Sequence, residues 1–223
     1  MKTAILIDGG FYRRRAQIML GEKTAAERAQ ELQDYCRRHL QHKKGTDSNL
    51  YRIFYYDCLP MEKKVFHPFL QSQIDYSKTE LYRWMHTFID ELKKRRKFAI
   101  RLGKLADEQA HFSLREPTLR KLCNGSMAFS DVKEKDFLLE VDQKGVDMKI
   151  GLDIASLAYK KQVDQIVLIS GDSDFVAAAK LARREGIDFI LDPLFNPIKP
   201  DLFEHIDGLR TCDSRFNPSC KRQ

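Results

Sequence analysis

The sequence lacks the cysteine patterns of disulfide-stabilised and zinc-binding proteins. Its five cysteines are odd in number, widely scattered and never arranged as C-x-x-C. Such usage indicates neither a disulfide framework nor a zinc site, and reduced thiols are expected.

Long apolar runs are missing as well. No stretch approaches the roughly 20 residues that a helix needs to span a membrane, and the N-terminus is typical of a core strand rather than a signal peptide. We therefore expect a cytoplasmic protein with no membrane partner.

Glycine-rich phosphate-binding motifs, internal repeats and low-complexity tracts are also absent. Neither G-x-G-x-x-G nor G-x-x-x-x-G-K-[ST] occurs, which argues against nucleotide-binding Rossmann folds and P-loops. No hinge separates two halves of the chain. We expect a single domain over residues 1–210, with an irregular insertion around 106–144 and a tail over 211–223.

What the sequence does contain is enough apolar material for a core and an excess of positive charge. Hydrophobic residues make up 43% of the 223 residues, and the formal net charge is +7. This charge suits a polyanionic partner such as nucleic acid, but it is equally compatible with an ordinary basic protein.

The stretch TAILIDGGFYRRR, residues 3–15, combines an apolar run, one acid, two glycines and three arginines. A short apolar run bounded by Gly-Gly is typical of a parallel strand covered on both faces. Asp8 then lies at the carboxyl end of the strand, where open α/β sheets bind ligands. It either handles a ligand or caps the helix that follows.

Similar apolar runs alternate with amphipathic helices along the chain, which predicts an α/β fold. Right-handed crossovers then give a three-layer α/β/α sandwich with a mostly parallel sheet. Capping-box patterns at Thr24 and Glu27, and at Ser77 and Glu80, indicate two helix starts, and Gly186 indicates a helix end. The expected strands cover residues 3–7, 51–56, 98–102, 165–169 and 187–191, with a polar loop at 43–49 and a hairpin or strand at 137–141 in the insertion.

Acids from three segments are expected at one edge of this sheet. Parallel strands share a carboxyl end, so Asp172 and Asp174, which follow the fourth strand, emerge beside Asp8. On the helix before that strand, at about 100° per residue, Asp147 and Asp153 lie about 60° to either side of the buried stripe. The alternative for Asp147 is a first-turn acid that only interacts with the helix dipole.

Clustered carboxylates repel one another unless a cation neutralises them. All-oxygen ligands without His or Cys select Mg²⁺ or Mn²⁺ over Zn²⁺. Such an ion can orient a water molecule, lower its pKa and stabilise charge on a scissile phosphate. The acids therefore indicate phosphodiester chemistry.

Three stretches, AILIDGG, KGVDMKIGLDIASLA and QIVLISGDSDFVAAAKLARREGIDFIL, resemble the NYN-domain branch of the PIN-like nucleases in order and spacing. The resemblance covers the first strand and residues 144–191, whereas residues 40–140 match only in their general pattern. It implies a PIN-like sheet of about five parallel strands and metal-dependent cleavage of RNA. The implied partner is RNA, which we expect to be single-stranded, with DNA left open.

The resemblance also implies site residues. Catalytic and metal-binding acids fall at Asp8, Asp147, Asp172 and Asp174, with Asp153 as a further acid of the helix motif and Ser170 as a supporting hydroxyl. Many relatives carry Asn shortly after the first Asp-Gly, where this chain has Phe11, a departure that bears on substrate placement near Asp8.

Basic residues near the acids are candidates for holding phosphates through sequence-independent contacts. The alternative for each is a solvated helix face. The candidates are Arg13, Arg14, Arg15 and Lys149.

We therefore hypothesise a Mg²⁺- or Mn²⁺-dependent ribonuclease. The main alternative is a non-catalytic nucleic-acid-binding or adaptor protein that keeps the fold. A small-molecule phosphatase of the haloacid-dehalogenase type is a weaker alternative, because Gly10 occupies the position where that class requires a second acid.

Overall fold

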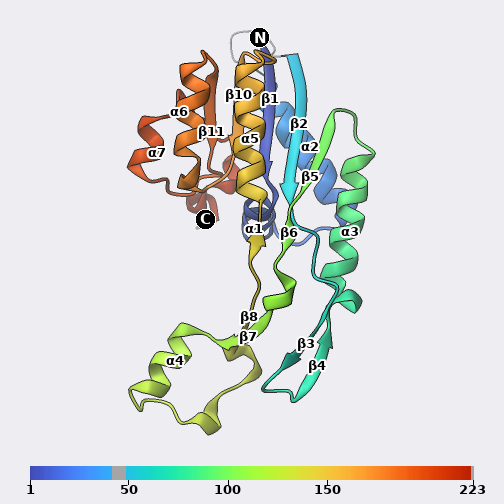
Figure 1. The fold of residues 1–223 in the computed structure, drawn as a ribbon, viewed down its shortest axis with the longest axis vertical. Coiled ribbons are helices and arrows are strands. Elements are labelled where there is room, and N and C mark those ends of the chain that lie inside the picture. Colours follow the sequence, from blue (N-terminus) through green and yellow to red (C-terminus); the bar gives the residue numbers. More distant parts are fainter. Residues whose placement is uncertain (42–48, 222–223) are drawn as a thin grey trace.

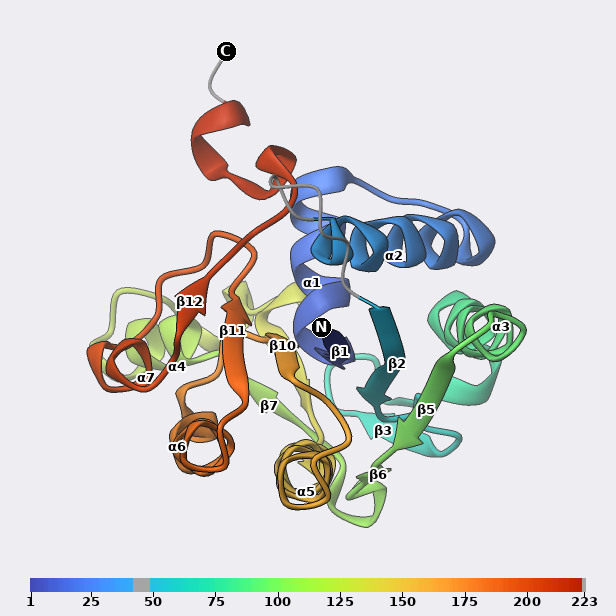
Figure 2. The same cartoon turned by 90° about the horizontal axis from the view of Figure 1, so that it is seen from above.

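The computed structural model describes residues 1–41 and 49–221 and is organised around a six-stranded parallel sheet (Figure 1). The predicted polar loop at 43–49 lies outside the described residues, except for its last residue. The strand order is β12-β11-β10-β1-β2-β5 (Figure 2). The strands are β1 (Lys2–Asp8), β2 (Asn49–Asp57), β5 (Phe98–Leu102), β10 (Gln165–Ile169), β11 (Asp188–Asp192) and β12 (Gly208–Leu209).

The prediction of a mostly parallel sheet of about five strands is confirmed. All five pairings between neighbouring strands are parallel. The five predicted strands are β1, β2, β5, β10 and β11, and the structure adds the two-residue strand β12 at one edge. Strand β10 is buried along its whole length, as a strand covered on both faces must be.

Helices cover both faces of the sheet and give the predicted α/β/α sandwich (Figure 2). One face packs against α5, α6 and α7, and the other against α1, α2 and α3. Residues of β1 alternate between the two cores, with Leu6 in the first and Ile7 in the second. The helices are α1 (Gly9–Leu20), α2 (Ala25–Leu40), α3 (Glu80–Lys93), α5 (Val146–Tyr159), α6 (Val176–Arg184) and α7 (Pro200–Glu204).

Local sequence signals place the helix ends. Thr24 and Glu27 form the predicted capping box at the start of α2. The second predicted box is wrong, because α3 begins one residue after Thr79, whose hydroxyl accepts a hydrogen bond from the Tyr82 N–H. Ser77 lies instead in a short 3₁₀ turn before this cap.

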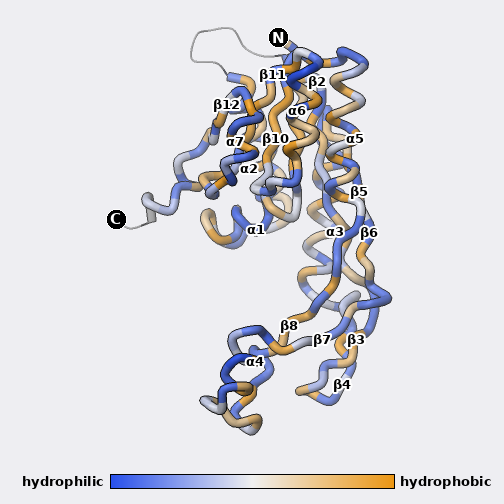
Figure 3. The backbone as a smooth tube through the Cα atoms, turned by 60° about the vertical axis from the view of Figure 1, so that its left-hand side comes forward, coloured by the Kyte–Doolittle hydropathy of each residue, from blue (hydrophilic) through white to orange (hydrophobic). Residues whose placement is uncertain are grey.

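A second group of strands projects beyond the carboxyl edge of the sheet, and we call it the arm (Figures 1 and 3). Its two main hairpins contact each other, and the rings of His67 and Phe112 lie 4.1 Å apart between centroids. The predicted strand at 137–141 is confirmed as β8, whereas the β3–β4 hairpin was not predicted. The arm consists of β3 (Lys64–His67), β4 (Ser72–Asp75), β6 (Lys104–Leu105), β7 (His111–Leu114), α4 (Glu116–Cys123), β8 (Phe137–Glu140) and β9 (Gln143–Lys144).

Across residues 1–41 and 49–221, no helix is both long and apolar enough to cross a membrane.

Candidate active site

Acidic residues gather where the parallel strands end, at the lower edge of the sheet in Figure 1. Asp8 is the last residue of β1, Asp57 of β2 and Asp192 of β11. Ser170 follows β10, and its backbone N–H donates to the Asp192 carbonyl at 3.2 Å. The strand pairing therefore fixes the relative positions of these residues through the backbone.

Asp8 joins the first strand to the first helix. Its Oδ1 accepts a hydrogen bond from the Phe11 N–H at 3.0 Å, which caps α1. Its Oδ2 accepts from the Ser170 hydroxyl at 3.2 Å. Burial raises the pKa of Asp8, and the negative charge of Asp147 raises it further, against the lowering effect of the Phe11 N–H. The helix-cap interpretation is confirmed, and a ligand-handling role is compatible with it.

Ser170 links Asp8 to the loop after β10. The serine is fully buried, and its hydroxyl oxygen accepts from the Asp172 N–H at 3.2 Å while donating to Asp8. Asp172 in turn accepts from the Asp174 N–H at 3.0 Å and caps a 3₁₀ turn. The loop that carries both acids is thus tied to the end of β1.

Asp147 reaches the same edge from a third segment, in the first turn of α5. Gly145 precedes the helix with φ +81°, a left-handed conformation that glycine adopts without strain. Partial burial raises the pKa of Asp147, and the charges of Asp172 and Asp174 add to the effect. The four acids predicted at Asp8, Asp147, Asp172 and Asp174 therefore interact electrostatically.

These acids do not form a closed set of metal ligands. Within the described ranges, no group of three or more His, Cys, Asp or Glu side chains is placed to hold a metal ion. Two of the carboxylates point to N–H and O–H donors instead. A set of oxygen donors that repel one another nevertheless suits Mg²⁺, which typically takes only one or two carboxylates and keeps several waters. The charge of Asp147 raises the pKa of Asp8, so these two carboxylates interact across the segments that carry them.

Asp153 does not lie with the other four predicted acids. It accepts hydrogen bonds from the Tyr56 hydroxyl at 2.7 Å and from Arg101 Nε at 3.1 Å. At about 1.5 Å of rise per residue, it lies about 9 Å along the helix from Asp147. Asp153, which we expected to bind a metal ion, is instead an ion-pair partner of Arg101.

Two of the three arginines on α1 are occupied by protein partners. Arg13 forms an ion pair with Asp57 at 2.8 Å, and Arg15 donates to the carbonyl oxygens of Leu194 at 2.7 Å and Phe216 at 3.2 Å. Their expected role as phosphate ligands is replaced by a structural one.

The other two basic candidates stay near the surface. Arg14 donates to the Gly10 carbonyl at 3.2 Å, and the Lys149 ammonium donates to the Leu102 carbonyl at 2.7 Å. Both contacts are exposed and involve no acid, so each side chain keeps its positive charge at the carboxyl edge.

Asp57 was missed by the sequence analysis. It is fully buried and accepts from Arg13, from the Tyr55 hydroxyl at 2.8 Å and from the Cys58 N–H at 2.8 Å. Its charge contributes to the raised pKa of Asp8. An acid at the end of a predicted strand, as in YYD, was the signal that could have found it.

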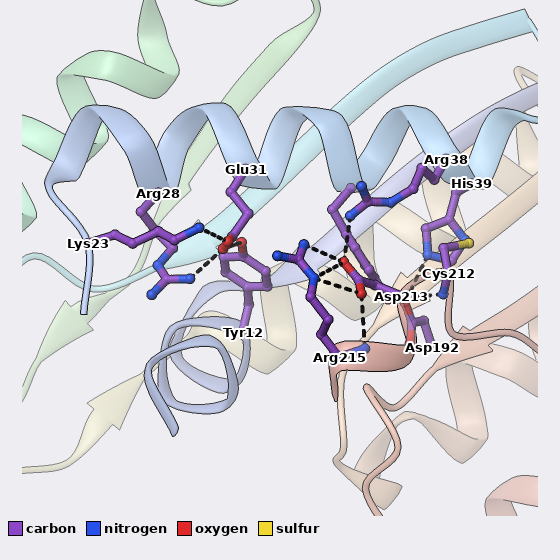
Figure 4. A network of polar contacts seen from close by, with 11 residues as sticks. Tyr12, Lys23, Arg28, Glu31, Arg38, His39, Asp192, Cys212, Asp213 and Arg215 are labelled. Atoms are coloured by element: carbon purple, nitrogen blue, oxygen red, sulfur yellow. Dashed lines mark hydrogen bonds and ion pairs between the residues drawn. The ribbon is translucent and has the colours of Figure 1, made fainter. Parts of the chain in front are cut away.

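Asp192 is a second missed acid of the same kind, and Figure 4 shows its surroundings. His39 Nε2 lies 2.8 Å from its Oδ2, and the Thr211 hydroxyl donates to its Oδ1 at 2.7 Å. Tyr35 also donates to this carboxylate. Asp192 is fully buried and connects α2 to the segment after β12.

An open parallel sheet with carboxylates from separate segments at its carboxyl edge is typical of α/β domains that bind ligands at that edge. The family model of the NYN domain matches residues 80–197, which is more than half of the chain. The chain therefore belongs to the NYN domain family. The match includes Asp147, Ser170, Asp172 and Asp174, whereas Asp8 precedes it.

Other comparisons add little about function. No curated protein matches the chain. Among solved structures, the chain is similar to a protein of unknown function from Vibrio parahaemolyticus RIMD 2210633, at 14% identity and a TM-score of 0.47, over 96% of this chain and 94% of that one.

Membership of the NYN family indicates the general class of chemistry to which the domain belongs. The NYN domain is a PIN-like domain of the nuclease type, and NYN nucleases act on nucleic acids. PIN-like nuclease domains generally use divalent metal ions.

Proposed function

We propose that the protein is a Mg²⁺- or Mn²⁺-dependent ribonuclease that hydrolyses phosphodiester bonds of single-stranded RNA. The observation that carries this proposal is the electrostatic coupling of acids from three segments at one sheet edge: the charge of Asp147 raises the pKa of Asp8, and Asp172 and Asp174 raise that of Asp147. Carboxylates that raise one another's pKa form a site that a divalent cation stabilises.

The proposed roles follow from the contacts. Asp8 and Asp147 would hold the ion, which when bound would supply positive charge to the phosphate and lower the pKa of water. Asp172 and Asp174 would hold and orient water around it. Ser170 keeps Asp8 and the loop in a fixed relation, because its hydroxyl bonds to both.

Arg14 and Lys149 are the proposed phosphate contacts. Each is at the surface with only a backbone carbonyl as its partner in the described contacts. A lysine or arginine in this state can exchange that carbonyl for a phosphate oxygen at little cost, because the carbonyl is solvated when released. The proposed setting is the cytoplasm, supported by the free thiols of Cys36, Cys58, Cys123 and Cys212.

A cleavage assay with labelled single-stranded RNA tests the proposal. Asp147→Asn should lower the cleavage rate about 100-fold or more, as expected for a group that stabilises transition-state charge. Asp153→Asn is the matched control, since this acid lies on the same helix but is bound to Arg101, and it should stay within about threefold of the parent rate.

Cleavage that persists in EDTA, or in the Asp147→Asn variant, would contradict the proposal. Tight RNA binding without cleavage would favour the adaptor alternative. Equal cleavage of single-stranded DNA would retain the nuclease and overturn the RNA assignment.

A further inference from the structure

A cavity of about 270 Å³ lies beside the ion pair of Arg13 and Asp57. Its walls come from α1, the turn before α2, the first turn of α2 and the first turns of α3. Leu81 and Trp84 provide an apolar wall, and Gln17, Glu22 and Glu80 provide polar groups. A concave site with an apolar surface and a few polar groups is typical of small-ligand recognition.

The indole of Trp84 is held in a fixed orientation. Its Nε1–H donates to the Lys23 carbonyl at 2.9 Å, and its ring stacks on Phe88 with 5.0 Å between centroids and 14° between planes. Leu81, one turn earlier on α3, is 60% exposed, which is high for a large apolar side chain. A flat ligand ring could pack against this wall without moving the indole.

The charges around the cavity disfavour a phosphate. Arg13 is paired with Asp57, while Lys23 and Arg28 are both paired with Glu31, as Figure 4 shows for the latter two. Each positive charge thus already has an acid of the protein as its partner, with Lys23 and Arg28 sharing Glu31.

The two acids of the cavity rim are free of such pairing. In the part of the chain that the structure describes, neither Glu22 nor Glu80 forms an ion pair, and both residues are exposed. Free carboxylates accept hydrogen bonds and donate none, so they favour a ligand that presents hydrogen-bond donors, such as an amino group.

The cavity is close to the proposed catalytic edge. Asp8 caps α1, and Arg13, five residues further along, is displaced by about 7.5 Å along the helix axis at about 1.5 Å of rise per residue. Stacked nucleotides repeat at about 3.4 Å along a strand. A base in the cavity would therefore belong to a nucleotide near the one whose phosphate lies at Asp8.

We propose that this cavity is a nucleobase subsite for amino-bearing bases, in which Trp84 and Leu81 pack against the ring and Glu22 and Glu80 accept hydrogen bonds from the exocyclic amino group. The inference rests on the proposed ribonuclease function and adds the recognition of one base near the cut. Adenine, cytosine and guanine carry the required amino group, and uracil does not.

Trp84 is the only tryptophan of the chain, so its fluorescence reports on this cavity alone. The full chain is titrated in EDTA with adenosine, cytidine, uridine and ribose 5-phosphate, and free N-acetyltryptophanamide serves as the control for collisional quenching. Adenosine and cytidine should quench saturably, with dissociation constants about tenfold lower than that of uridine, because uridine lacks the exocyclic amino group and offers only its ring N3–H as a base donor.

Leu81→Asn should weaken adenosine binding about tenfold, since it removes apolar contact with the ring. Leu152→Asn is the matched control, because Leu152 is a similarly exposed leucine, at 62%, on α5. Saturation by ribose 5-phosphate, equal affinity for uridine, or an equal effect of the two leucine variants would overturn the proposal.

The binding and cleavage results separate the two proposals. RNA cleavage without saturable quenching by any nucleoside would overturn the subsite and leave the ribonuclease in place. Saturable quenching by adenosine in a preparation that cleaves no RNA would overturn the ribonuclease and leave a nucleobase-binding site.

Discussion

Arg13 and Asp57 form a two-point ion pair between α1 and β2, with Nε to Oδ2 at 2.8 Å and Nη2 to Oδ1 at 3.0 Å. The Asp57 side chain is completely buried, and that of Arg13 is 21% exposed. A buried carboxylate depends on its partner, because an uncompensated charge in the interior is strongly destabilising. The pair therefore secures the start of α1, and with it the position of Asp8.

Arg13→Met should lower the free energy of unfolding by about 3–5 kcal/mol, since it leaves Asp57 buried without its cation. Urea unfolding followed by circular dichroism measures the change. Arg14→Met is the control, because Arg14 is on the same helix and bonds only to a backbone carbonyl, and it should cost about 0.5 kcal/mol or less. Equal losses for the two variants would show that the ion pair contributes nothing specific.

Gly9→Ala should destabilise the protein, because a Cβ at this position would lie 2.4 Å from Cζ of the buried Tyr55 and 2.6 Å from the Tyr56 carbonyl oxygen. Neither atom can move freely, so a loss of about 1–3 kcal/mol is expected. Gly151→Ala is the matched control within a helix. A Cβ at this position would meet nothing within 4 Å. Alanine should therefore raise the free energy of unfolding by up to about 1 kcal/mol, because it is the better helix former. Thermal melts should show a lower melting temperature for Gly9→Ala and a higher one for Gly151→Ala. Melting temperatures that change in the same direction in both variants would contradict the prediction.

Stability should fall as the pH is raised from about 6.5 to about 9, through the titration of His39. Burial alone lowers the pKa of His39, but the hydrogen bond to Asp192 and the neighbouring Cys212 outweigh burial and raise it to about 9. The ordinary value in the unfolded chain is about 6.5. A pKa that is raised by folding gives a stabilisation that is complete below about 6.5 and lost as the pH passes about 9.

Chemical denaturation across this pH range should show a fall of about 1–3 kcal/mol, and His39→Gln should reduce the slope. His111→Gln is the control, because its side chain is 65% exposed on the arm. A slope that is unchanged in His39→Gln would assign the pH dependence to other groups.

Asp147→Asn should leave the melting temperature in EDTA unchanged or slightly higher, because it removes the repulsion from Asp172 and Asp174 that raises the pKa of Asp147. Adding Mg²⁺ should stabilise the parent protein by about 2.7 kcal/mol at about 100 times the dissociation constant. The variant should show a smaller response. An equal Mg²⁺ response in both proteins would place the ion elsewhere.

The sheet could be predicted because its strands are short apolar runs with a polar residue at the end. Residues 165–169, QIVLI, are an example, since they are buried throughout. The β3–β4 hairpin could not be predicted in the same way. Its strands have only four residues each, too few for a period to be recognised.

The positions of the candidate site residues could be predicted where they depend on strand ends, and not where they depend on contacts between distant side chains. Asp8 ends β1, Asp172 comes after β10, and the Ser170 hydroxyl bonds to both residues. The error at Asp153 arose because an angle around a helix ignores the rise along its axis. The run of arginines gave no sign that Arg13 meets a carboxylate 44 residues away.

The position of β1 inside the sheet affects how the protein is made. This strand is synthesised before the others, yet one of its two neighbours, β10, pairs Gln165 with Thr3 across 162 residues of chain. Contacts so far apart in sequence form slowly, because a long loop must close first. On the ribosome, the central strand therefore stays open along one side until most of the chain has emerged, and this interval is when it is most exposed to binding by a chaperone or to pairing with another nascent chain.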